Sequence, residues 1–98
     1  MESSVIGLLE IELLNNASRS LKDKRKDLNR LVDKLHQEFH VAVAEVGAQN
    51  TWQRTELAVV AVSNDARHNT RVLERVVNRI RTRHLAWQLL DYSIREVY

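Results

Sequence analysis

The chain has 98 residues, a formal net charge of +2, 44% hydrophobic and 29% charged residues, and no cysteine. A chain of this length supports one small two-layer core, so we expect residues 1–98 to form a single domain. The lack of cysteine excludes disulfides, thiolate metal sites and a cysteine nucleophile.

The start of the chain does not read as a targeting segment. Residues 1–4 carry an acid rather than bases, and the apolar run that follows is interrupted by Glu10 and Glu12. No run reaches the roughly 20 apolar residues that a membrane-spanning helix needs. We therefore expect a cytoplasmic protein that has no membrane partner.

Six elements are predicted, in the order strand, helix, strand, strand, helix, strand. Apolar residues alternate in the strands and recur every three or four positions in the helices. Ser20 with Asp23, and the cluster Ser63–Asp65, provide side chains that cap helix starts. The predicted strands are Val5–Leu14, His40–Gly47, Thr55–Val62 and Leu85–Val97, and the predicted helices are Ser20–Gln37 and Ala66–His84.

The same patterns predict the apolar faces. In the second strand they leave open whether Val41 and Val43 or Ala42 and Ala44 face the core. The apolar faces of the other elements are Val5, Gly7, Leu9, Ile11 and Leu13; Leu21, Leu28, Leu31, Val32, Leu35 and Phe39; Leu57, Val59 and Ala61; Val72, Leu73, Val76, Val77 and Ile80; and Leu90, Tyr92 and Ile94.

With right-handed crossovers, this order gives a ferredoxin-like βαββαβ sandwich of the α+β class. Its antiparallel sheet has four strands in the order 4-1-3-2, and both helices lie on one face. In this topology three segments meet at one end of the sheet: Arg19–Arg25, Gln49–Arg54 and Arg81–Trp87. That end collects arginine, lysine and tryptophan.

The bases gather on the predicted helices. Ser20–Gln37 carries six bases and three acids, and Ala66–His84 carries six arginines against Glu74 alone, so the remainder of the chain is acidic. A basic helical layer beside an acidic remainder makes a dipolar surface that can steer the protein toward a polyanion.

Four arginines form the clearest candidate binding feature. Arg67, Arg71, Arg75 and Arg79 follow one another every four residues, which places them in a ridge opposite the apolar stripe of their helix. The planar guanidinium group suits phosphate oxygens. The alternative is an ordinary solvated helix face.

Trp52 lies in the predicted connection between the second and third strands, where a large aromatic residue is uncommon unless it covers or binds something. It either closes the end of the core or contacts a base or a partner protein. Arg54 either joins that contact or pairs across the sheet with Glu12 or Glu10. Lys22 and Arg25 complete this second candidate contact edge.

The predicted sheet face without helices carries no aromatic residue on the first and third strands, so it lacks the base-stacking platform of one common RNA-binding mode. It carries Ile6, Leu8, Val60 and Val62 instead. An uncovered apolar patch indicates burial against a second copy, so these residues form a candidate dimer face.

We expect no enzyme activity, cofactor or metal. His36 and His40 are separated by a predicted helix-to-strand junction, and no third ligand is suitably spaced. Asp65 and His68 fit a helix cap better than a catalytic base. Small ferredoxin-like acylphosphatases hold phosphate in a glycine-rich loop with an arginine after the first strand, whereas this chain has Arg19 there and no glycine.

Four stretches carry a family resemblance: Ser20–Arg25, Val43–Val46, Trp52–Arg54 and Val62–Asp65. In their order and spacing the chain resembles the YlxP-like family, small bacterial proteins with a domain-of-unknown-function label. The chain departs from the family at Gly47–Asn50, where the family more often has Asp and His. The resemblance implies a ferredoxin-like fold and no catalytic residues. The family's genes often lie beside that of ribosome-binding factor A, which implies a link to RNA or ribosomes.

From these features we expect a non-catalytic RNA- or ribosome-associated accessory protein that acts in ribosome assembly or translation. The alternative is a dimeric protein-interaction module that uses the sheet face and Trp52 and binds no nucleic acid. The predicted RNA- or partner-binding residues are Arg71, Arg75, Arg79, Trp52, Arg54, Lys22 and Arg25.

Overall fold

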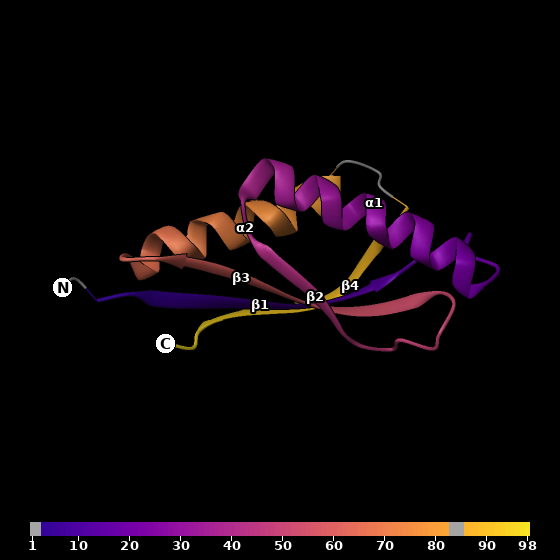
Figure 1. The fold of residues 1–98 in the computed structure, drawn as a ribbon, viewed down its shortest axis with the longest axis horizontal. Helices are drawn as coiled ribbons and strands as arrows, with labels where there is room; N and C mark the ends of the chain where they lie inside the picture. Colours follow the sequence, from indigo (N-terminus) through magenta and orange to yellow (C-terminus); the bar gives the residue numbers. More distant parts are fainter. Residues whose placement is uncertain (1–2, 83–85) are drawn as a thin grey trace.

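The computed structural model describes residues 3–82 and 86–98, and its elements follow the predicted order (Figure 1). Residues 1–2, the predicted helix end at His84 and the predicted strand start at Leu85 lie outside the described residues. The strands are β1 (Val5–Leu14), β2 (Ala42–Gly47), β3 (Arg54–Ser63) and β4 (Gln88–Glu96), and the helices are α1 (Leu21–Phe39) and α2 (Ala66–Thr82).

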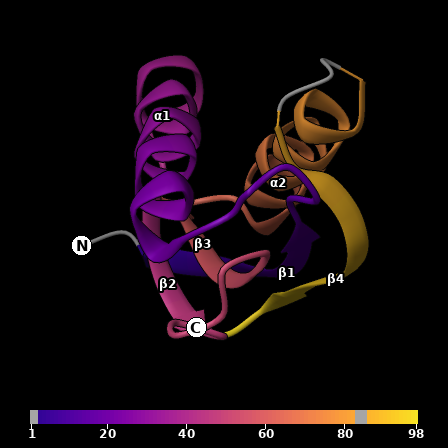
Figure 2. The same cartoon turned by 90° about the vertical axis from the view of Figure 1, so that its right-hand side faces the viewer.

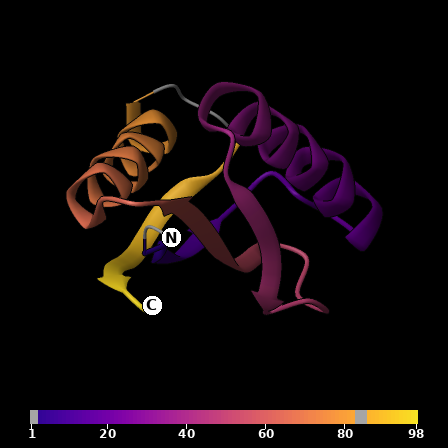
Figure 3. The same ribbon diagram turned by 60° about the vertical axis from the view of Figure 1, so that its left-hand side comes forward.

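The four strands form one antiparallel sheet in the order β2-β3-β1-β4, which is the predicted order read from the opposite edge. Leu9 of β1 lies opposite Val59 of β3 and opposite Ile94 of β4. Both helices lie on one face of the sheet, and the opposite face carries no helix of the described chain (Figures 2 and 3). The predicted ferredoxin-like α+β fold is confirmed.

Hydrogen bonds from side chains set where the helices begin. Oγ of Ser20 accepts from the N–H of Asp23 at 3.0 Å, and Oδ2 of Asp23 accepts from the N–H of Arg19 at 3.0 Å. Oδ1 of Asp65 accepts from the N–H of Arg67 at 3.0 Å at the start of α2. These bonds satisfy amide groups that have no acceptor near a helix start.

The core lies between the helices and the sheet. Val41 is buried and Val43 packs against the core, whereas Ala42 and Ala44 are exposed, which answers the question that the sequence left open. Trp87 is buried with them. The buried apolar residues of the described chain are Leu9, Ile11, Leu13, Leu28, Leu31, Leu35, Val41, Leu57, Val59, Ala61, Leu73, Val76, Val77, Ile80 and Trp87.

Three residues of the predicted apolar faces are exposed: Leu21 of α1, and Leu90 and Tyr92 of β4. Leu21 is 39% exposed, and the first buried position of α1 is Lys24 instead. The pairing of β1 with β4 shifts by one residue at a bulge, so Leu89 lies opposite Leu13 and Leu90 is left 41% exposed. In residues 3–82 and 86–98, neither helix has the length and apolar character that crossing a bilayer requires.

Candidate functional site

The connection between β2 and β3, residues 48–53, lies against the start of α1 at one end of the molecule (Figure 1). We call this connection the hairpin loop. The N–H of Asn15 donates to the carbonyl oxygen of Gln53 at 2.6 Å. Nε2 of Gln53 donates to the carbonyl oxygens of Asn16 and Ser18 at 3.3 and 3.2 Å. Nζ of Lys24 donates to the carbonyl oxygen of Gln49 at 3.4 Å, so the predicted meeting of Arg19–Arg25 with Gln49–Arg54 is confirmed.

Lys24 ties the same loop to α1 from inside the fold. Its side chain is 3% exposed, and Nζ lies 2.9 Å from Oε2 of Glu45 and donates to the carbonyl oxygen of Ala48 at 2.6 Å. Oε2 of Glu45 also accepts from Oγ1 of Thr55 at 2.6 Å. The sequence pattern indicates Lys24 only as one base of a charged helix, because a lysine almost never lies fully buried unless it is paired.

Trp52 lies in the hairpin loop and is 54% exposed. The interpretation in which it closes the end of the core is therefore wrong. Trp87 is the buried tryptophan at 3% exposure, and its Nε1 donates to the carbonyl oxygen of Asp27 at 3.4 Å. The burial of Trp87 was not predicted from the sequence, although a buried indole with a bonded N–H is a common core arrangement.

The other predicted residues of this edge lie in different layers. Lys22 and Arg25 are exposed on the first turns of α1. Arg54 starts β3 and forms an ion pair with Glu12 of β1, with side-chain exposures of 48% and 28%. The predicted structural role of Arg54 is confirmed. Because its partner belongs to the helix-free face of the sheet, Arg54 lies on the face opposite the helices.

Three of the four ridge arginines on α2 are exposed. Arg67, Arg71 and Arg75 form no ion pair with any residue that the structure describes. The guanidinium carbon of Arg75 lies 5.7 Å from the centre of the Phe39 ring. This cation–π contact orients the guanidinium group over the end of α1, and its N–H groups form no ion pair with a carboxylate of the described residues.

Arg79 does not belong to an open ridge. Its side chain is only 17% exposed and forms an ion pair with Glu38 of α1, and its Nε is buried with no hydrogen-bond partner among the described residues. The prediction that all four arginines face solvent is therefore wrong at Arg79. Each four-residue step rotates by about 40° around the helix axis, and this drift carries the last arginine into the seam between the helices.

The helix-free face of the sheet has an apolar part and an acidic part. Ile6 lies opposite Val62 and Leu8 opposite Val60, so the structure brings the four predicted dimer-face residues together. Val62 is 65% exposed. Further along the sheet, Glu12 lies opposite Glu56 on one side and opposite Asp91 on the other.

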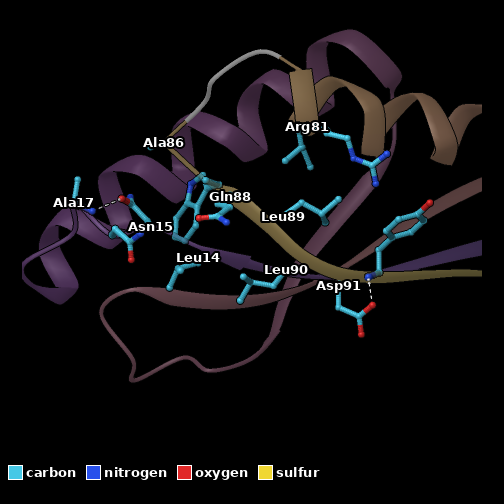
Figure 4. Close-up of a pocket in the computed structure, with 13 residues that line it drawn as sticks. Leu14, Asn15, Ala17, Arg81, Ala86, Gln88, Leu89, Leu90 and Asp91 are labelled. Carbon is cyan, nitrogen blue, oxygen red and sulfur yellow. Dashed lines mark hydrogen bonds between the residues drawn. The ribbon is translucent and has the colours of Figure 1, made fainter.

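A groove of about 730 Å³ lies at the end of the molecule where α2 ends and β4 begins. Figure 4 shows its wall built from Asn15 and Ala17 of the loop after β1, Arg81 of α2, and residues 88–91 of β4. The guanidinium carbon of Arg81 lies 5.8 Å from the centre of the Tyr92 ring. Of this lining, only Arg81, Ala86 and Trp87 belong to a segment that was predicted to lie at one end of the sheet, and the hollow itself was not predicted.

The residues that the structure describes offer no group of three or more histidine, aspartate or glutamate side chains able to hold a metal ion. The candidate binding residues are cationic and aromatic side chains on α1, α2 and the hairpin loop.

These features define a small ferredoxin-like α+β protein with a basic helical layer. The chain belongs to the family described as "Protein of unknown function (DUF503)", whose sequence model matches residues 6–94. Uncharacterized protein YlxP of Bacillus subtilis (strain 168) is 37% identical to it over 73 residues, which are 74% of this chain and 79% of that protein. The predicted resemblance to YlxP-like proteins is confirmed.

A solved structure shares the fold. The de novo designed protein Foldit4 matches this chain with a TM-score of 0.56 and 14% sequence identity, covering 98% of both chains. A likeness at this identity concerns the arrangement of the backbone alone.

Proposed function

We propose that this protein is a non-catalytic RNA-associated accessory protein that holds structured RNA against its helical layer. Arg67, Arg71 and Arg75 of α2 contact backbone phosphates, and Lys22 and Arg25 of α1 extend the contact toward the hairpin loop. Ribosomal particles are the first RNA to test. The proposed step is ribosome assembly or translation.

The observation that carries the proposal is that the exposed arginines of α2 have no acidic partners in ion pairs. Glu74 is the only acid among residues 66–82, and the three exposed arginines form no ion pair within the described chain. Three exposed guanidinium groups that share a single nearby carboxylate and form no ion pair with it repel one another, and this repulsion raises the free energy of the unbound protein. A polyanion removes that repulsion, and its phosphates accept paired hydrogen bonds from the planar fork.

Arg79 positions the exposed arginines of α2 but does not itself contact phosphate in this proposal. Its ion pair with Glu38 joins the ends of α1 and α2, so Arg75 is presented above Phe39 at a fixed distance from the first helix. We therefore withdraw Arg79 from the proposed phosphate contacts. Arg54 is also withdrawn, because it pairs with Glu12 on the opposite face of the sheet.

Charge reversal on α2 tests the proposal. Arg71→Glu should weaken binding to a structured RNA by at least about tenfold at low salt, since it replaces a charged hydrogen bond by repulsion. The matched control is Arg95→Glu, because Arg95 is exposed on the acidic face, beside Glu10. Equal affinities of the two variants would remove α2 from the interface.

A second candidate function rests on the apolar part of the sheet face. The pairs Ile6–Val62 and Leu8–Val60 form a contiguous patch on a face that no described helix covers. A dimeric protein-interaction module uses such a patch for a second copy. This function requires no nucleic acid, and a wild-type protein that fails to bind RNA at low salt while forming dimers would favour it.

A further inference from the structure

The hairpin loop presents an exposed indole on a braced backbone. The neighbours of Trp52 are both held: the N–H of Thr51 donates to the carbonyl oxygen of Ala48 at 3.1 Å, and Gln53 bonds to the loop before α1. Nζ of Lys24, from the buried side of the loop, donates to the carbonyl oxygen of Ala48. Hydrogen bonds therefore hold the backbone of the loop that carries Trp52, whose side chain is 54% exposed.

The surroundings of Trp52 fit a nucleic acid better than a protein. Protein hot spots usually place a tryptophan within a rim of contacts that excludes water. The neighbours of Trp52 in the hairpin loop, residues 49–51, are exposed and polar: glutamine, asparagine and threonine. Such a loop offers a π face without an apolar rim.

Cations lie on the helix to which the loop is tied. Lys22 and Arg25 are exposed on the first turns of α1, and Arg25 lines the same shallow depression as Gln49 of the hairpin loop. The acids of these turns already accept hydrogen bonds, Asp23 from the N–H of Arg19 and Asp27 from Nδ2 of Asn15. An aromatic face beside cations is the combination that binds single-stranded nucleic acid.

We propose that Trp52 stacks on an unpaired nucleobase while Lys22 and Arg25 hold the phosphates next to it. Paired bases in an RNA helix present no free face to a side chain, so the base must come from a single-stranded segment. The inference rests on the proposed function and adds the class of RNA. That class is a duplex, held by α2, which continues into an unpaired strand at the hairpin loop.

Intrinsic fluorescence reports on the contact, because the chain has two tryptophans and only Trp52 is exposed. Three RNA probes separate the contributions: a blunt hairpin, the same hairpin with a short uridine overhang, and the overhang with abasic sugars in place of uridine. The uridine overhang should quench the fluorescence and bind about tenfold more tightly than the blunt hairpin, the gain expected of one stacked base. The abasic overhang should give neither effect.

Trp52→Ala should abolish the gain from the uridine overhang and leave affinity for the blunt hairpin unchanged. Trp52→Phe should keep most of the gain, and Asn50→Ala is the matched control in the same loop. A uridine overhang that binds the wild-type protein and Trp52→Ala equally would overturn the inference and leave the indole to a protein partner. If the blunt hairpin binds and abasic and uridine overhangs behave alike, the inference fails while the proposed function stands. If no probe binds the wild-type protein, both fail.

Discussion

Nζ of Lys24 lies 2.9 Å from Oε2 of Glu45 at a place where the lysine side chain is 3% exposed. The ammonium group also donates to the carbonyl oxygen of Ala48, and the carboxylate also accepts from Thr55. A buried charge is tolerated when its hydrogen bonds are satisfied in this way. The pair therefore links α1, β2 and the hairpin loop through one polar network.

Replacing Lys24 by methionine should lower the free energy of unfolding by about 3 kcal/mol, because the largely buried carboxylate of Glu45 loses its counter-charge. Urea denaturation measures the change. Lys26→Met is the matched control, since Lys26 is exposed two residues further along α1, and its effect should stay within about 0.5 kcal/mol. Similar losses in the two variants would show that the network does not stabilise the fold.

The two glycines should respond differently to alanine. A Cβ on Gly7 would lie 3.1 Å from Cβ of Asn69 and 3.1 Å from Cδ1 of Leu73, so α2 must move away from β1. We expect Gly7→Ala to cost about 1–3 kcal/mol of stability. A Cβ on Gly47 would overlap the carboxylate of Glu56, an exposed flexible side chain that can rotate away. In thermal unfolding, Gly7→Ala should therefore have a lower melting temperature than Gly47→Ala. The reverse order would contradict the close packing of α2 on β1.

The seam between the helices should depend on Arg79. Arg79→Ala removes the ion pair with Glu38 from a side chain that is 17% exposed, and should lower the free energy of unfolding by about 1–2 kcal/mol. Arg67→Ala serves as the control, since Arg67 is exposed at the start of α2. Urea denaturation of both variants measures the difference. If Arg67→Ala is the more destabilising of the two, Arg79 has no special role at the seam.

The second candidate function predicts an oligomer that depends on the sheet face. Val62→Glu should convert a dimer into a monomer in multi-angle light scattering, because a carboxylate replaces an apolar side chain that is 65% exposed. Leu21→Glu is the control, since Leu21 is an exposed leucine in the other layer. A wild-type protein that stays monomeric at high concentration excludes the dimer.

The fold was predictable because local patterns agree with one another along most of the chain. The alternation of β1, the capping residues Ser20 and Asp65, and the apolar stripe of α2 each specify one element, and their order allows few topologies. The wrong predictions within the fold include a position at which pairing between distant strands sets the register. The bulge opposite Glu12 shifts β4 by one residue, which periodicity within β4 does not reveal.

The candidate site was predictable only in part. Spacing placed Arg67, Arg71 and Arg75 on an exposed helix side, but the loss of Arg79 to Glu38 depends on how α1 crosses α2. In the same way, a single sequence gives no sign of which tryptophan is buried. Trp87, the residue before β4, is buried and its indole N–H donates to the carbonyl oxygen of Asp27 on α1, whereas Trp52 on the hairpin loop is exposed.

The salt dependence of RNA affinity tests the central claim most directly. With three arginines of α2 and with Lys22 and Arg25 of α1 on phosphates, the logarithm of the association constant should fall against the logarithm of salt concentration with a slope of about −4.5. The double variant Arg71→Glu/Arg75→Glu should flatten that slope by about two units. A slope that stays the same in the double variant, or binding that does not respond to salt, would contradict the account.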